Sequence, residues 1–140
     1  MEIKHKLISA DSHAGFDRDD FTKRMSAKWG ERIPQIVETN KNGKRVDRWS
    51  VYGEPKSNDV ANCPALMGEP FPTYPQRYEE IPKAYHDPKA RLAMLDADGV
   101  DAEVLFPNPP GGTFFEPGDI EYELDVVRAY NDTLAEWKRV

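Results

Sequence analysis

The sequence predicts an α/β fold in which short parallel strands alternate with helices. Three observations predict this class: a strand-like run over residues 3–10, a helix over 88–97 followed directly by a strand over 100–107, and an amphipathic helix over 119–140. The chain of 140 residues has the length of one ordinary domain. We therefore expect one domain, built from two strand–helix units and a long excursion between them.

The first strand is expected at residues 3–10, which read "IKHKLISA" and become apolar just before Asp11. A helix is expected next, at about 18–28, with Asp17 as its N-cap and Pro34 ending the region. Its buried face would consist of apolar side chains at i, i+4 spacing, namely Phe21, Met25 and Trp29.

A β-hairpin is predicted over about 35–52, because two strand-like runs flank Asn42-Gly43. This dipeptide suits a two-residue type I′ turn. The turn places Ile36 opposite Trp49, so that the hairpin presents one apolar face.

Residues 53–86 form a long irregular segment, since periodicity is lost and prolines accumulate there. A loop of this length in a domain is usually functional or disordered. Its aromatic residues favour a loop that packs onto another part of the protein.

Regular structure is expected to return at Asp87, which would cap a helix with Pro88 at its first position and Gly99 at its end. Leu92 and Leu95 would face inward. The strand over 100–107 then runs into a Pro/Gly turn.

The last helix, over 119–140, carries apolar residues at helical spacing. The stripe expected to be buried comprises Leu124, Val127, Tyr130, Leu134 and Trp137.

Composition excludes several classes of partner. The net charge is -6 and the basic residues are scattered, whereas nucleic-acid and anionic-membrane surfaces need a concentrated basic face. No apolar run approaches a membrane span, and the single Cys63 cannot form an internal disulfide, so we expect a cytoplasmic protein. Only 39% of the residues are hydrophobic, which is little for a self-contained core and favours a homo-oligomer.

Asp11 and His13 are the candidate functional pair. In an extended strand, residues i and i+2 point to the same side, roughly 6.5 Å apart along the chain, so both could reach one metal ion. The alternative is a strand-end histidine hydrogen-bonded to a neighbouring carboxylate. Asn108, at the end of the second strand, could form a turn or contact substrate, because parallel βα folds place their chemistry at this edge.

Four stretches of the chain resemble one known family: "ISADSHAGFDRDDFTKRMSAKWGERIPQIVE", "WSVYGEP", "DPKARLAMLDADGVDAEVLFPN" and "VVRAYNDTLAEW". In order and spacing they are similar to the N-terminal part of the amidohydrolase-related proteins, often labelled amidohydrolase 2. The resemblance implies the N-terminal portion of a distorted (β/α)8 TIM barrel. In this portion Asp11 and His13 are first-strand ligands of a divalent metal, zinc before iron or manganese, and residues 14–86 form a cap containing the hairpin.

The resemblance also implies a reaction. The reaction is hydrolysis or non-oxidative decarboxylation of a small carboxylate or amide substrate. In hydrolysis the metal activates water, and in decarboxylation it polarises a substrate oxygen. His86 would then be a cap residue facing substrate, its alternative being a helix-start residue. The family's later metal ligands have no counterpart in these 140 residues, so we expect little or no activity from this chain by itself.

Three hypotheses follow. The first is a segment of a metal-dependent amidohydrolase-like enzyme, and the second is a non-catalytic module of the same partial fold that binds partners or self-assembles. The third is a metal site shared between chains, in which His86 or His5 of a neighbouring copy joins Asp11 and His13.

Overall fold

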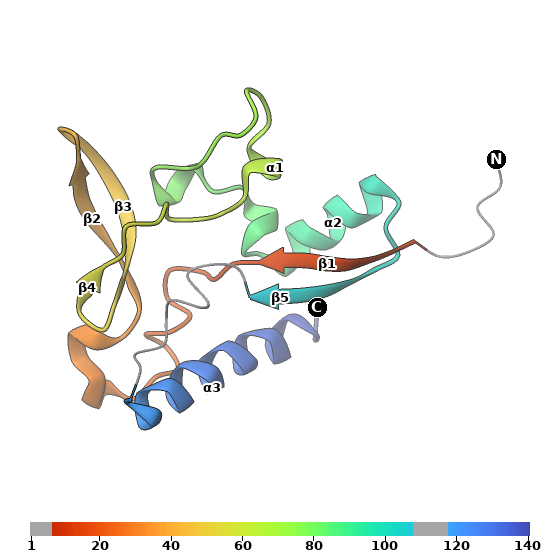
Figure 1. The fold of residues 1–140 in the computed structure, drawn as a ribbon. Coiled ribbons are helices and arrows are strands. Elements are labelled where there is room, and N and C mark those ends of the chain that lie inside the picture. Colours follow the sequence, from red (N-terminus) through yellow and green to blue (C-terminus); the bar gives the residue numbers. More distant parts are fainter. Residues whose placement is uncertain (1–6, 108–117) are drawn as a thin grey trace.

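The computed structural model describes residues 7–107 and 118–140, and within them it shows a mixed α/β protein with one parallel and one antiparallel sheet (Figure 1). The parallel sheet pairs β1 (Ile8–Ala14) with β5 (Ala102–Pro107). The antiparallel sheet has the order β2 (Gln35–Lys41), β3 (Lys44–Val51), β4 (Glu54–Pro55). The helices are α1 (Pro64–Met67), α2 (Pro88–Asp98) and α3 (Ile120–Trp137), with 3-10 turns η1 (Ala27–Arg32), η2 (Tyr78–Glu80) and η3 (Lys83–Tyr85).

The first strand lies later in the chain than expected. It runs from Ile8 to Ala14, so Asp11 and His13 belong to the strand and do not follow it. The reason is the partner strand, because pairing with β5 continues through His13 opposite Phe106. Residues 1–6, on which the expected start fell, lie outside the described part of the chain.

The helix expected at about 18–28 is absent, and this prediction was wrong. Residues 18–24 form consecutive turns and are followed by η1. The Asp20 carboxylate accepts the N–H of Asp17 at 2.7 Å, and the Asp20 N–H donates to the Asp17 carbonyl at 3.1 Å, so the chain turns here without continuing into a helix. The apolar residues of the expected face are nevertheless buried in the core, namely Phe21, Met25 and Trp29.

The hairpin is present with the expected register. Ile36 lies opposite Trp49. Asn42 and Gly43 have φ values of 54° and 81°, which are the two left-handed conformations that a type I′ turn requires.

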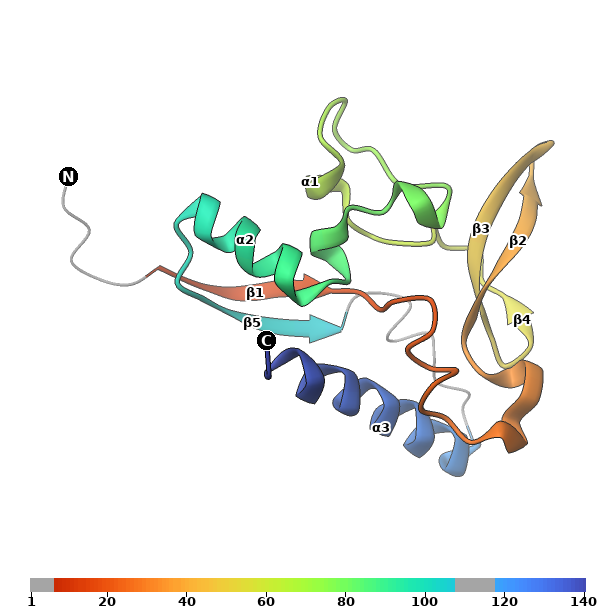
Figure 2. The same cartoon turned by 180° about the vertical axis from the view of Figure 1, so that it is seen from behind.

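The segment between the hairpin and α2 has little regular structure and runs beside the hairpin over part of its length (Figure 2). Asp47 of β3 is buried, its N–H donates to the carbonyl of Gln76 at 2.8 Å, and its carboxylate accepts the N–H of Tyr78 at 2.8 Å. Trp49 donates through Nε1 to the carbonyl of Val60 at 3.1 Å. The hairpin therefore supplies hydrogen-bond partners to a segment that has little regular structure of its own.

Helix α2 begins and ends as predicted. The Asp87 carboxylate accepts the N–H groups of Lys89 and Ala90, and Gly99 ends the helix with a φ of 70°. Its buried face differs from the prediction, because Leu92 is exposed and Arg91 is buried in its place.

Helix α3 joins the two ends of the molecule, running from the hairpin side to the parallel strands in both views (Figures 1 and 2). Part of the predicted buried stripe was wrong, since Leu124 and Val127 are exposed. The buried face instead consists of Tyr122, Val126, Ala129 and Thr133, of which the first three belong to the main core. The cause is Tyr122, whose hydroxyl donates to the carbonyl of Arg32 at 2.8 Å and whose ring meets Trp29 edge-on.

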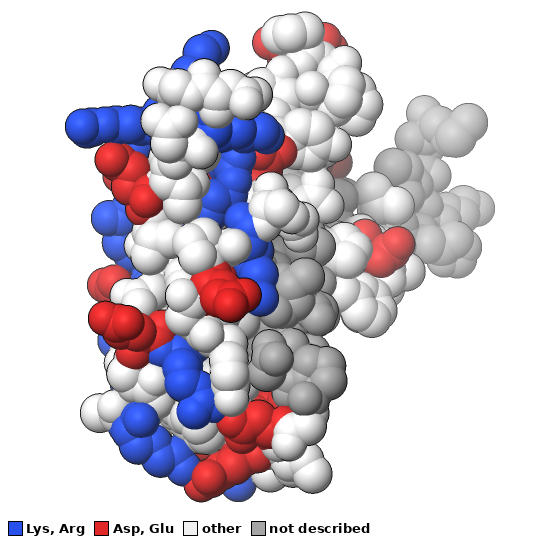
Figure 3. Space-filling view, turned by 60° about the vertical axis from the view of Figure 1, so that its left-hand side comes forward, with Lys and Arg blue, Asp and Glu red and all other residues white. Residues whose placement is uncertain are grey.

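Charges of both signs are interspersed on the hairpin side of the molecule (Figure 3). Arg77 lies 3.0 Å from Glu38 and 3.5 Å from Asp47, and Arg45 lies 3.5 Å from Glu38. No helix among residues 7–107 and 118–140 is long and apolar enough to cross a membrane.

Candidate metal centre

Asp11 and His13 lie side by side on β1. The Oδ1 atom of Asp11 is 3.4 Å from the Nε2 atom of His13, and the side chains are 84% and 44% exposed, respectively. The His13 ring also contacts Phe106 of β5, with 6.1 Å between ring centroids. The pair is therefore open to solvent on one side and supported by the neighbouring strand on the other.

A β-bulge contributes to this arrangement. Two residues lie between the paired positions Ser9 and Ser12 of β1, whereas one lies between their partners Glu103 and Leu105 of β5. A bulge inserts one unpaired residue and re-aims the side chains around it. Here the inserted residue falls in the stretch that contains Asp11.

The donor pair fits part of a metal site. Zinc–oxygen and zinc–nitrogen bonds of about 2.1 Å at a tetrahedral angle place two ligand atoms roughly 3.4 Å apart. The observed separation of 3.4 Å has this value, and a carboxylate with an imidazole is an ordinary donor combination for zinc. Within the described residues no group of three or more His, Cys, Asp or Glu side chains could hold a metal.

His86 has other contacts. Its Nδ1 atom lies 3.6 Å from Asp17 Oδ2 and 3.5 Å from the hydroxyl of Tyr78. Burial raises the pKa of Tyr78 to about 12, so its phenol stays neutral in this cluster at physiological pH. The described interactions of His86 thus connect it to the turn after β1 and to η2, and none joins it to Asp11 or His13.

Two other candidates cannot be placed. Asn108 and His5 lie outside the described residues, so the expected substrate contact of Asn108 remains a prediction.

Gly15 is a positioning residue that the sequence reasoning missed. Its N–H donates to the carbonyl of Tyr85 at 2.8 Å, and a Cβ atom at this position would lie 1.8 Å from the Tyr85 ring. The chain that leaves the candidate site is therefore held against η3 by a contact that only glycine permits. The available signal was Gly15 itself, a residue without a side chain directly after β1.

Comparisons with known proteins identify the fold but assign no family. No family model matches the sequence, and no curated protein matches it either. The structure is similar to the crystal structure of an amidohydrolase from Mycobacterium avium subsp. paratuberculosis, with a TM-score of 0.65 and 18% sequence identity. The match covers 96% of this chain and 38% of that one.

The class of protein follows from this likeness. The chain is an α/β protein whose fold is shared with part of an amidohydrolase, and it spans 38% of that protein's length. At this level of identity the likeness establishes fold and leaves activity to be argued from the site.

Proposed function

We propose that this chain is a segment of a metal-dependent amidohydrolase-like enzyme and that it contributes the first two metal ligands, Asp11 and His13. The observation that carries the proposal is the 3.4 Å separation of their donor atoms, on a parallel strand of a fold shared with an amidohydrolase. Divalent zinc is the metal we propose, with iron and manganese as alternatives.

Each of the two proposed ligands binds a metal in one protonation state only. Asp11 binds as a carboxylate and His13 as a neutral imidazole, so protons compete with the metal for both side chains. When bound, the metal would activate water or polarise a substrate oxygen, which serves either hydrolysis or loss of carbon dioxide from a small carboxylate or amide substrate. The chain's own contribution is to hold the two donors on one strand, with His13 supported by Phe106.

The remaining ligands are proposed to belong to further strands of a (β/α)8 barrel. A barrel of this type needs about 200 residues or more. The 14–86 segment would then be a cap beside the metal, which makes His86 and Asn108 candidates for substrate contact. The nucleotide sequence downstream of the Val140 codon tests this directly, because the proposal requires an open reading frame with further His and Asp codons.

Zinc titration of the chain tests the ligand pair. We expect wild type to bind one zinc ion weakly by calorimetry, because two ligands hold a metal less firmly than three or four. Asp11→Asn and His13→Ala should each lower the affinity by at least about tenfold, since each removes one of two donors.

Two controls sharpen the titration. Asp98→Asn removes an exposed carboxylate at the end of α2 and should leave the affinity unchanged. His86→Gln should also bind zinc like wild type, whereas a loss in this variant alone would favour the site shared between chains. Equal affinities in wild type, Asp11→Asn and His13→Ala would refute the ligand assignment.

A second candidate function, self-assembly, is favoured by the bare face of the parallel sheet. Ile8, Val104 and Phe106 are apolar and exposed on the β1–β5 pair. Parallel sheets are almost always covered on both faces, so this face is expected to be buried against another surface. In this second proposal a further copy of the chain covers it.

Light scattering distinguishes the second candidate. The self-assembly proposal expects a dimer or a larger species, and expects Phe106→Lys to shift it towards monomer by placing a charge on the buried face. Leu124→Lys, at an exposed apolar position of α3, is the matched control and should not change the mass. A wild-type monomer with a cooperative thermal transition would exclude self-assembly.

A further inference from the structure

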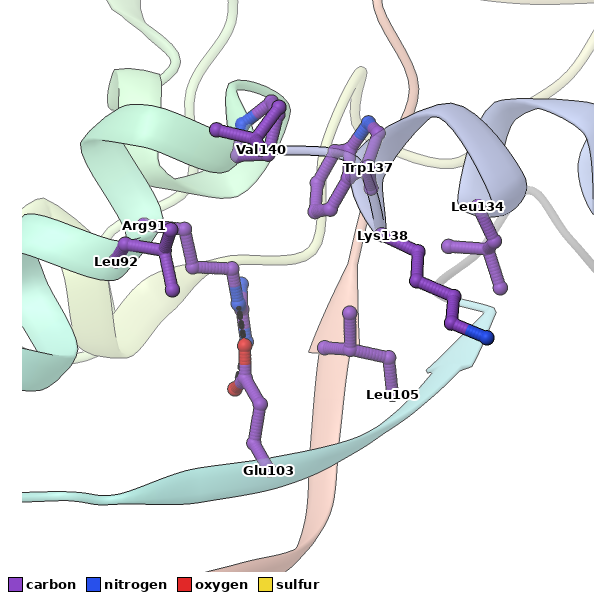
Figure 4. Close-up of a pocket in the computed structure, with 9 residues that line it drawn as sticks. Arg91, Leu92, Glu103, Leu105, Leu134, Trp137, Lys138 and Val140 are labelled. Carbon is purple, nitrogen blue, oxygen red and sulfur yellow. Dashed lines mark hydrogen bonds and ion pairs between the residues drawn. The ribbon is translucent and has the colours of Figure 1, made fainter.

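A cavity lies on the other face of the parallel sheet, between α2, β5 and α3 (Figure 4). Its volume is about 480 Å³, within the range of small-molecule sites. Its walls are mainly apolar, and its lining residues include Leu92, Leu105, Leu134 and Trp137.

The cavity is separate from the candidate metal ligands. Side chains alternate between the two faces of a strand, so Glu103 and Leu105 face the cavity while Phe106 lies beside His13 on the opposite face. A ligand in the cavity would therefore be separated from His13 by the sheet itself. This inference does not depend on the proposed metal chemistry.

The charged groups around the cavity differ in their pairing. Arg91 and Glu103 form a two-pronged ion pair on one side, with Arg91 Nη2 donating to Glu103 Oε2 at 2.8 Å, so their charges neutralise each other. Lys138 lies on the opposite side (Figure 4). It has no ion-pair partner among the residues that the structure describes. Lys138 is exposed, and its ammonium group is thus an unpaired side-chain charge at the edge of an apolar space that Val140, the last residue of the sequence, also lines.

We propose that this cavity binds a small amphipathic carboxylate, with its apolar body between Leu105 and Trp137 and its carboxylate at the ammonium group of Lys138. The apolar part of the wall, formed by Leu92, Leu105, Leu134 and Trp137, disfavours a strongly polar ligand, because burying polar groups without partners is unfavourable. The unpaired cation selects an anionic head group over a neutral one. A medium-chain fatty acid or an arylalkanoate has this combination.

Octanoate is a suitable probe, and Trp137 reports its binding because this residue lines the cavity. We expect a saturable change in tryptophan fluorescence with a dissociation constant of about 1 mM or below. Trp137→Phe should remove the signal, since Trp29 and Trp49 are buried elsewhere in the core. Octanol, which has the same chain without the charge, should bind at least about tenfold more weakly.

Two variants test separately whether binding depends on the charge of Lys138 and on the open volume of the cavity. Lys138→Met keeps an apolar stem, so it should weaken octanoate binding by about tenfold and leave octanol binding unchanged. Leu105→Trp fills the cavity and should remove both, with circular dichroism confirming that the variant folds. Lys44→Met, in the distant hairpin, is the charge-matched control.

The outcomes are distinct. Absence of a saturable change in wild type up to about ten times the expected dissociation constant would overturn the site. Equal octanoate affinity in Lys138→Met and wild type would overturn the assignment of the carboxylate to Lys138. A signal that persists in Leu105→Trp would place the ligand outside this cavity.

Discussion

Glu103→Ala is expected to destabilise the fold by about 3–5 kcal/mol, because it leaves the guanidinium of Arg91 buried without its counter-charge. The Arg91 side chain is 7% exposed and the Glu103 side chain is 9% exposed. Arg91 makes both of its Glu103 contacts from α2 to β5 and a third to the carbonyl of Ala84 at 3.2 Å. Urea unfolding of wild type and variant would measure the difference in the free energy of unfolding.

Two controls accompany this variant. Arg91→Met combined with Glu103→Leu removes both charges, and should recover much of the loss because no buried ion is left unpaired. Lys23→Ala breaks an exposed ion pair, Lys23 with Asp19 at 3.5 Å, and should cost less than about 1 kcal/mol. A Glu103→Ala variant as stable as Lys23→Ala would show that the buried pair contributes little to stability.

Trp49→Ala is expected to lower the free energy of unfolding by about 3–5 kcal/mol, the usual range for a large buried aromatic residue. Trp49 packs edge-on against Phe21, with ring centroids 5.9 Å apart, and its indole N–H donates to Val60. The substitution therefore opens a cavity in the core and also leaves the Val60 carbonyl without this donor. Urea unfolding, read by circular dichroism because a tryptophan is lost, provides the measurement.

Trp49→Phe separates the two contributions, since it keeps most of the ring volume and removes the hydrogen bond. Its expected cost is about 1–3 kcal/mol. Trp137→Ala is the matched control for losing an indole from a half-buried position, and should cost less than Trp49→Ala. Equal losses in Trp49→Ala and Trp137→Ala would mean that the hairpin contributes less to the core than its burial indicates.

These two expectations bear on the proposed function. The pair of Arg91 and Glu103 fixes α2 against β5, the strand whose Phe106 contacts His13. Trp49 connects the hairpin to the irregular segment that leads towards α2 and the His86 cluster. Weakening either contact should therefore disturb the supports of the candidate metal ligands as well as overall stability.

The candidate site shows how far sequence reasoning reaches. The pairing of Asp11 with His13 was predicted from i, i+2 spacing, and the structure places the two side chains together. Their position inside β1, the bulge beside them and the contact with Phe106 were not predictable, because each depends on a strand almost a hundred residues away. Gly15 was missed for the same reason, since its close neighbour Tyr85 is distant in sequence.

The sequence by itself determined the elements whose signals are local. The Asn42-Gly43 turn fixes the hairpin register, and Asp87, Pro88 and Gly99 set the ends of α2, because turns and caps depend on backbone conformations of adjacent residues.

Only the tertiary structure decided which surfaces are buried. Phe21, Met25 and Trp29 reach the core without the expected helix, and α3 buries the face of Tyr122 and leaves Leu124 exposed. An apolar pattern predicts which residues will be buried. It does not predict which surface covers them, because that surface comes from elsewhere in the chain. Packing against that partner outweighs local helix preference, because tertiary contacts supply most of the stability of a helix.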